Sequence, residues 1–212
     1  MYMVLFFCSM SSNILLVGDS RVKDVTSNHF VTRSLPGARM SEISNYISIN
    51  KSRIEAKYTM VVVSAGINDL SDRLANGDVI YRRNIFLQIQ AIINKIKDSL
   101  SIPVIFTTIV SKDLKKCAAK FPRKSFFHPT AITLHMQHQF EAVVDAVNGE
   151  IDEANKSHNL HCAFHLDCRL ASRGRRQRKE KILYDRLAAD GLHPTADLSL
   201  RWTRRVERLL AL

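Results

Sequence analysis

The amino-acid sequence predicts an α/β protein whose parallel β-sheet is covered by helices on both faces. Short runs that are entirely apolar, such as residues 14–17 and 61–63, are typical of strands buried inside such a sheet. Between these runs lie segments with helical periodicity, and residues 85–96 place isoleucines along one helix face. Strand-like and helical segments alternate about five times along the chain, and this order implies right-handed βαβ units.

The individual elements follow from the spacing of apolar residues. We expect strands, the second of them weaker because it is partly polar, at residues 14–17, 30–34, 61–63, 103–110 and 160–166. We expect helices at residues 43–57, 85–100, 131–156 and 195–212. Two segments interrupt the alternation. Residues 111–129 are long for a loop between a strand and a helix, which is typical of a lid or a binding wall, and residues 172–181 form a basic run.

Composition and charge limit the possible classes of protein. The chain has 212 residues with 46% hydrophobic content and only 7 Gly, which indicates an ordinary folded protein. We predict a single domain over residues 12–212, preceded by a short apolar N-terminal extension over residues 1–11. No apolar run approaches the roughly 20 residues that span a bilayer, and the extension lacks the basic start of a signal peptide. We therefore expect an intracellular protein, cytoplasmic or nuclear.

Charge and cysteine content add two expectations. The 31 Lys and Arg residues exceed the 20 Asp and Glu residues and give a net charge of +11, an excess that favours polyanions such as nucleic acid as partners. The four cysteines show no spacing of a disulfide framework, so we expect reduced thiols at Cys8, Cys117, Cys162 and Cys168.

Residues suited to serine chemistry follow several of the predicted strands. Ser20 follows the first strand, Gly37 the second and Asn68 the third, while Asp190 and His193 follow the last. Because these positions share the carboxyl edge of a parallel sheet, we expect them to meet. A serine nucleophile needs a base, a carboxylate that holds the base and donors for an oxyanion. A structural explanation exists for each residue alone: Asn68 could cap a helix, and Asp190 could cap a turn.

The motifs around these residues resemble the SGNH, or GDSL-type, hydrolase superfamily. The resemblance covers the chain from about residue 12 to its end, with "GDS" at residues 18–20, Gly37, "GIND" at residues 66–69 and "DGLHP" at residues 190–194 in the family's order. It implies a three-layer α/β/α sandwich, flavodoxin-like, with a five-stranded parallel sheet. The sequence departs from the family at Arg21, where the usual residue is leucine, and in the second block, which is reduced to Pro-Gly-Ala.

The resemblance also implies roles for individual residues. Ser20 would be the nucleophile, His193 the base and Asp190 the carboxylate that orients it. The backbone N–H groups of Ser20 and Gly37 and the side chain of Asn68 would form the oxyanion hole. No cofactor is implied. The expected activity is that of a serine esterase acting on a small-molecule or lipid ester with a short acyl or acetyl group.

Other features of the sequence leave a second function open. A non-catalytic module of the same fold could bind RNA or DNA through its basic surface, and the basic run supplies Arg173, Arg175, Arg176, Arg178, Lys179 and Lys181. Parts of the chain also resemble the esterase-like domains of animal LINE-type retrotransposons or genes derived from them. Histidines and cysteines gather in residues 158–168, but a strand there would point them to opposite faces, so we expect no metal site.

Overall fold

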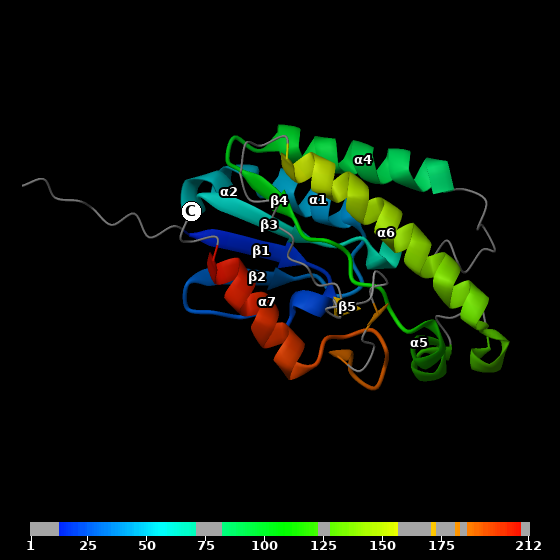
Figure 1. The fold of residues 1–212 in the computed structure, drawn as a ribbon. Coiled ribbons are helices and arrows are strands. Elements are labelled where there is room, and N and C mark those ends of the chain that lie inside the picture. The colour runs from blue at the N-terminus through cyan, green and yellow to red at the C-terminus, as the bar shows by residue number, and fades with distance from the viewer. Residues whose placement is uncertain are drawn as a thin grey trace, which may run out of the picture.

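A computed structural model describes residues 13–70, 82–122, 128–156, 171–172, 181–182 and 186–208. Its centre is a parallel sheet with the strand order β2-β1-β3-β4, drawn in Figure 1. The strands are β1 (Ile14–Gly18), β2 (Phe30–Ser34), β3 (Met60–Ser64) and β4 (Val104–Phe106). All four were predicted, and their parallel register places every carboxyl end on one edge of the sheet.

Helices connect the strands and cover both faces of the sheet, as predicted (Figure 1). The helices are α1 (Met40–Ile49), α2 (Lys51–Lys57), α4 (Arg82–Ser99), α5 (Leu114–Lys120), α6 (Leu134–Lys156) and α7 (Ala196–Arg208). Side chains alternate across each strand. Val61 and Phe106 therefore pack in a core with α1, α4 and α6. Val62 and Ile105 pack on the other face, against Trp202 of α7.

The described part of the sheet has four strands, where we expected five. The residues expected to form the fifth, 160–166, lie outside the described residues. Among the described residues, the outer edge of β4 is bonded to α6. Asn155 accepts a hydrogen bond from Phe106 N at 2.9 Å and donates to Phe106 O at 2.8 Å. Asn148 makes the same pair of bonds with Ile109, at 2.6 and 2.9 Å. These bonds supply Phe106 with the partners that a neighbouring strand would otherwise give.

The expected lid over residues 111–129 contains regular structure. Residues 114–120 form α5, whose N-cap Asp113 accepts a hydrogen bond from Lys116 N at 3.0 Å. A short 3₁₀ helix, η3 (Pro129–Ala131), precedes α6. The expectation of a loop throughout residues 111–129 was therefore wrong at residues 114–120, because Asp113 provides a helix start that the charged residues after it hid in the sequence.

Other predictions fall where the structure gives no description. The N-terminal extension of residues 1–11 and residues 173–180 of the basic run lie outside the described residues. On either side of that run, β5 (Ala171–Ser172) and β6 (Lys181–Ile182) pair as a small antiparallel sheet. Among the described helices, none has the length and apolar character needed to cross a membrane.

Candidate active site

Ser20 stands in a tight turn that leaves the carboxyl end of β1. Asp19 is the N-cap of the 3₁₀ helix η1 (Ser20–Val22), and its carboxylate accepts a hydrogen bond from Arg21 N at 2.9 Å. The backbone N–H of Asp19 donates to Ser64 O of β3 at 3.2 Å, so the turn is anchored to the neighbouring strand. As the first residue of η1, Ser20 carries a backbone N–H that has no partner within the helical turn.

Asp190 and His193 lie in a loop that ends at the start of α7. A backbone turn closes this loop, because Gly191 N donates to Ala188 O at 2.9 Å and Ala188 N donates to His193 O at 2.8 Å. Asp190 Oδ1 accepts from Leu192 N at 2.9 Å and from His193 N at 3.0 Å. One carboxylate oxygen thus fixes the backbone of the loop and leaves the other for the imidazole.

The structure brings Ser20, His193 and Asp190 into one hydrogen-bonded line. Ser20 Oγ lies 3.0 Å from His193 Nε2, and His193 Nδ1 lies 2.6 Å from Asp190 Oδ2. A neutral imidazole with its proton on Nδ1 satisfies both contacts, because Nε2 is then free to accept from the hydroxyl. The His193 side chain is 34% exposed and that of Asp190 is 15% exposed, so the line opens to solvent at the imidazole.

The pKa values of the two carboxylates near Ser20 are shifted in opposite directions. Partial burial tends to raise the pKa of Asp190, but the hydrogen bonds from the His193 ring and from the two backbone N–H groups hold that pKa below its ordinary value. Asp19 is almost fully buried, and this burial raises the pKa of Asp19 although the nearby charge of Arg21 opposes the shift. The contacts of Asp190 therefore favour its charged form beside the imidazole.

Gly37 occupies a turn directly after β2. Ala38 N donates to Leu35 O at 3.0 Å, and Gly37 has a φ of 78°, which fits the third residue of a type II turn. This turn is bonded to the turn that holds Ser20, because Leu35 N donates to Gly18 O at 2.8 Å. In addition, Ser34 Oγ donates to Asp19 O at 3.0 Å. Gly37 thus stands in a backbone turn that is hydrogen-bonded to the turn holding Ser20.

Asn68 lies in a helical turn over residues 67–70, which follows β3. Its side-chain Nδ2 donates to Ala38 O at 2.9 Å, and an amide nitrogen carries a second N–H that this bond does not use. The neighbouring Asp69 accepts a hydrogen bond from Met40 N at 3.0 Å. Two consecutive side chains of the "GIND" motif therefore form hydrogen bonds with the backbone on the carboxyl side of Gly37. The sequence analysis gave no role to the second of them, Asp69.

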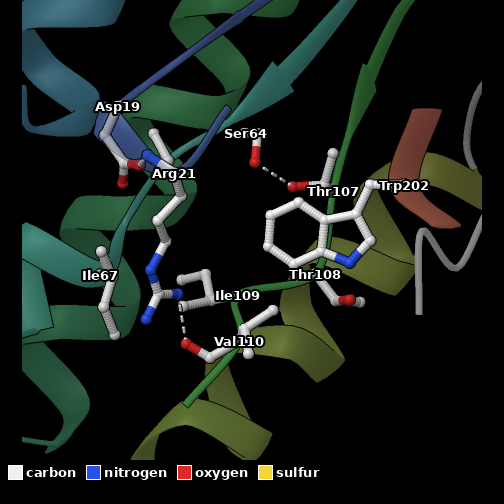
Figure 2. Close-up of a pocket in the computed structure, with 10 residues that line it drawn as sticks. Asp19, Arg21, Ser64, Ile67, Thr107, Thr108, Ile109, Val110 and Trp202 are labelled. Carbon is white, nitrogen blue, oxygen red and sulfur yellow. Dashed lines mark hydrogen bonds between the residues drawn. The ribbon is translucent and has the colours of Figure 1, made fainter. Parts of the chain in front are cut away.

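Arg21 is a second residue whose role was missed, although its departure from the family pattern marked it in the sequence. Its side chain is buried, and Nη1 donates to Val110 O at 2.5 Å. Figure 2 shows the guanidinium reaching from the turn of η1 past Ile67 to Val110. Together with Asp19 and with Trp202 of α7, these residues line a small cavity, with room for about one water molecule.

The remaining predictions about site residues have varied outcomes. The basic residues at positions 173–179 and the histidines and cysteines of residues 158–168 lie outside the described residues, and of Lys181 the structure describes only the backbone. Within the described part of the chain, no group of three His, Cys, Asp or Glu side chains could hold a metal ion. Cys117, in α5, has a free thiol, and burial raises the pKa of this thiol.

Comparison with known proteins rests on structure alone, because no protein-family model and no curated protein sequence matches the chain. A GDSL-like lipase from Parabacteroides merdae aligns with a TM-score of 0.51 at 14% identity, over 93% of this chain and 96% of the lipase. A mutant of an acetyl-xylooligosaccharide esterase from Geobacillus stearothermophilus aligns with a TM-score of 0.50 at 11% identity, over 95% of this chain and 94% of the esterase. At such low identity the likeness shows the fold alone, an α/β fold with a parallel sheet and covering helices.

Proposed function

We propose that the chain is a serine esterase of the SGNH type, which hydrolyses a carboxylic ester through an acyl-enzyme intermediate. The observation that carries this proposal is the hydrogen-bonded line from Ser20 Oγ through His193 to Asp190, with contacts of 3.0 and 2.6 Å. A hydroxyl at this distance from an imidazole nitrogen can transfer its proton as it attacks, which a free serine does poorly. The structural likeness to a GDSL-like lipase and an acetyl-xylooligosaccharide esterase also supports an ester hydrolase.

The first half of the reaction transfers the acyl group to Ser20. The Oγ proton passes to His193 Nε2 while Oγ forms a bond to the ester carbonyl carbon, and the carbonyl electron pair moves onto its oxygen. Asp190 stabilises the imidazolium that forms. The backbone N–H groups of Ser20 and Gly37 and the second amide N–H of Asn68 would then donate to the oxyanion. When the oxyanion collapses, the bond to the alcohol oxygen breaks and the alcohol takes the proton from Nε2.

The second half returns Ser20 to its resting state. A water molecule gives a proton to His193 Nε2 and adds to the acyl carbonyl carbon, which forms a second oxyanion in the same place. The bond between this carbon and Ser20 Oγ then breaks, and Oγ recovers the proton from Nε2. The carboxylic acid leaves, and one water has been consumed for each ester. The open, solvent-exposed side of the imidazole suits the entry of this water.

A short acyl group, such as acetyl, is the proposed acyl part of the substrate. One of the structural neighbours is named for acetylated xylooligosaccharides and the other is named a lipase, so chain length is the property that separates the two options. A series of p-nitrophenyl esters from acetate to dodecanoate should give the highest kcat/KM at the short end. A maximum at the long end would support a lipid ester in place of a short one.

Labelling with a fluorophosphonate probe tests the esterase proposal directly. Such a probe reacts with a serine that has been activated by a base, so we expect one labelled peptide, the one containing Ser20. The Ser20→Ala variant should not label, and Ser27→Ala, which removes a serine bonded to Glu207 elsewhere in the fold, should label normally. No labelling of the unmodified protein between pH 6 and 9 would refute the proposal.

The charge of the chain favours a second candidate function, the binding of RNA or DNA. The net charge is +11, and the helix α7 adds exposed Arg201, Arg204 and Arg208 to the basic run. Each neutralised phosphate of duplex DNA contributes about 0.9 to the log–log dependence of affinity on salt. Four to six contacts would therefore give a slope of about −4 to −5, whatever the nucleotide sequence.

Two variants with equal loss of charge distinguish local binding from general attraction. The first replaces four residues of the run by alanine, namely Arg175, Arg176, Arg178 and Lys179. The second replaces four scattered exposed residues, namely Arg53, Lys57, Lys95 and Lys120. Binding through the run requires the first variant to flatten the salt slope by about 3 while the second changes it much less. Equal effects would assign the binding to overall charge, and no binding at low salt would exclude this function.

A further inference from the structure

The nucleophile and the base reach the active site from distant parts of the chain, yet both are bonded to the same short segment. This connecting segment, residues 109–114, runs from the end of the β4 strand region to the start of α5. It contacts the turn that carries Ser20 on one side and the loop that carries His193 on the other. The contacts include hydrogen bonds to backbone atoms, which weaken steeply when their geometry is disturbed.

On the nucleophile side, the contact comes from Arg21. The residue directly follows Ser20, and its Nη1 donates to Val110 O at 2.5 Å across a sequence separation of 89 residues. Its side chain is only 5% exposed, and its rigid, planar head offers little freedom once bonded. A shift of the connecting segment would therefore move Arg21, the residue next to Ser20.

On the base side, the contact is made by the backbone and by close packing. Asp113 N donates to Gly191 O at 2.9 Å, and Gly191 lies between Asp190 and His193 in the sequence. A Cβ at Gly191 would come within 2.9 Å of Asp113 O and within 2.7 Å of Lys116 Cβ. The start of α5 thus rests directly on the loop that presents the imidazole.

Helix α6 forms hydrogen bonds with the connecting segment. Gln137 Nε2 donates to Lys112 O at 2.9 Å, and Gln137 Oε1 accepts from Leu114 N at 2.9 Å. Asn148 pairs with both backbone groups of Ile109. The residues on either side of Asp113 are therefore both bonded to Gln137. None of the bonds described above joins Gln137 to Ser20 or His193.

We propose that the connecting segment sets the distance between Ser20 Oγ and His193 Nε2, with Arg21 and Gln137 as positioning residues. The inference rests on the proposed esterase function and adds to it two residues that touch neither substrate nor reacting atoms. Its physical basis is that proton transfer and attack depend steeply on alignment. A misplacement of about 1 Å can lower a rate by about a hundredfold even when substrate binding is unchanged.

The test uses a pair of matched variants on α6. Gln137→Met keeps the size of the side chain and removes both hydrogen bonds to the segment. Gln139→Met makes the same change two residues further on, about 200° around the helix. We expect Gln137→Met to lower kcat for a small ester by about 10- to 100-fold with KM within about twofold. The rate of fluorophosphonate labelling should fall by a similar factor, while Gln139→Met leaves all three quantities unchanged.

A double variant separates positioning from a loss of stability. Arg21→Lys keeps the positive charge but shortens the reach to Val110 O, so kcat should also fall with KM retained. Because both residues act through one segment, the combined variant should lose about as much kcat as the worse single variant. Losses that multiply would show independent effects and overturn the inference. Rates are measured well below the Tm of each variant, so that unfolded protein does not contribute.

The possible failures point to different conclusions. An unmodified protein that neither labels nor hydrolyses esters refutes the proposed function, and the positioning roles then fall with it. An active protein in which Gln137→Met retains full kcat refutes the positioning roles alone. If Arg21→Lys does not fold, Gln137→Met against Gln139→Met still decides the matter, because Gln137 is only half-buried.

Discussion

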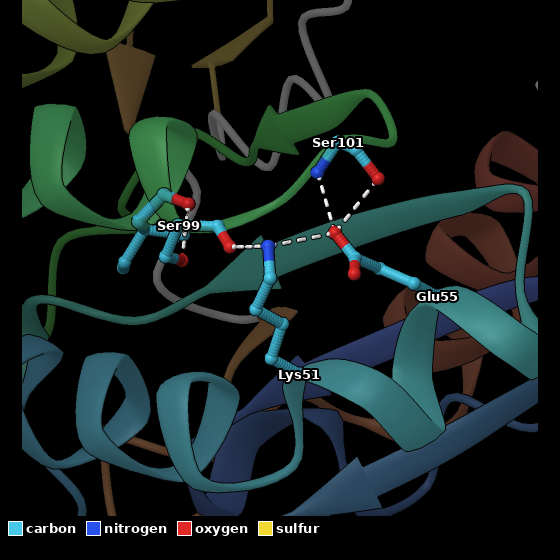
Figure 3. A network of polar contacts seen from close by, with 5 residues as sticks. Lys51, Glu55, Ser99 and Ser101 are labelled. Atoms are coloured by element: carbon cyan, nitrogen blue, oxygen red, sulfur yellow. Dashed lines mark hydrogen bonds and ion pairs between the residues drawn. The ribbon is translucent and has the colours of Figure 1, made fainter.

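One carboxylate at the carboxyl edge of the sheet and one at the opposite edge have similar hydrogen bonds but different roles. At the carboxyl edge, Asp190 accepts two backbone N–H groups and the imidazole of His193. At the opposite edge, where β3 and β4 begin, Glu55 of α2 accepts from Lys51 Nζ at 2.9 Å, from Ser101 N at 2.6 Å and from Ser101 Oγ at 2.8 Å, as drawn in Figure 3. Hydrogen bonds lower the pKa of both groups, that of Glu55 to about 2.

The difference lies in what each donor touches next. Lys51 also donates to the backbone of Ser99, so the bonds of Glu55 join α2 to the end of α4 and stop there. The donor to Asp190 is a ring whose other nitrogen meets Ser20. A carboxylate saturated by backbone, hydroxyl and lysine donors joins two elements, whereas one that holds an imidazole can support a proton transfer. The comparison therefore predicts changes in activity at one edge and changes in stability at the other.

The largest effect is expected for Asp190→Asn. The amide keeps the size of the side chain but no longer favours the imidazole proton on Nδ1, so kcat should fall by about 10⁴. Asp197→Asn is the matched control, because Asp197 is an exposed carboxylate of α7 bonded to Arg201. Ester hydrolysis at pH 7 measures both variants. A fall in kcat of less than tenfold for Asp190→Asn would show that Asp190, like Glu55, only joins two parts of the structure.

A smaller effect is expected for Asn68→Ala. The loss of one oxyanion donor typically lowers kcat by about 10² to 10³. Because the same side chain also bonds Ala38 O, unfolding in denaturant should be followed in parallel. Trp202, the only tryptophan of the chain and a buried one, reports that transition by its fluorescence. Unchanged kcat combined with lowered stability would show that Asn68 only grips the backbone beside Gly37.

Changes along β4, an outer strand of the described sheet, should alter stability and not activity, as at Glu55. Asn155→Leu leaves the backbone N–H and C=O of Phe106 buried without their partner, at a cost of about 1–3 kcal/mol of unfolding free energy. Asn94→Leu, at an exposed position of α4, should leave stability almost unchanged. Denaturant unfolding measures both variants. A loss of activity in folded Asn155→Leu protein would contradict the division between the edges.

The smallest effect is expected for Glu55→Gln, and it should depend on pH. The pKa of Glu55 is lowered in the folded protein from an ordinary value of 4.5 to about 2. A lowered pKa means that the charged carboxylate stabilises the fold above pH 4.5 and that this contribution disappears as the pH falls through 2. The Tm difference from the unmodified protein should therefore shrink in acid, with kcat unchanged. Glu153→Gln, at an exposed pair with Lys156, is the control.

The sequence predicted the parts of this molecule in which neighbouring residues carry the signal. Three of the four described sheet strands are built on apolar runs, β2 being partly polar, and Asp190 and His193 share one turn, so spacing alone suggested their contact. The same holds for the turn at Ser20. Local patterns of this kind survive folding because the chain connects the partners directly, and little tertiary information is needed to bring them together.

Two contacts between distant segments escaped prediction, although the meeting of Ser20 with His193 was expected because both follow strands at the same edge of the sheet. Nothing near Glu55 in the sequence points to Ser101, and nothing near Arg21 points to Val110. A usable signal did exist in α6, where Asn148 and Asn155 stand among apolar residues of its buried face, two helical turns apart. Buried amides of this kind require hydrogen-bond partners, and the backbone of an open strand is a suitable one.

These two asparagines have a further consequence for how the protein behaves at high concentration. An uncovered strand presents a row of free N–H and C=O groups, to which a strand from another molecule can add, and this is a common route to aggregation. Proteins usually protect such edges with charged side chains, prolines or bulges. Here Asn155 occupies both backbone groups that Phe106 would offer to a newcomer. A helix therefore gives β4 the protection against intermolecular strand pairing that a charged or kinked strand would otherwise need.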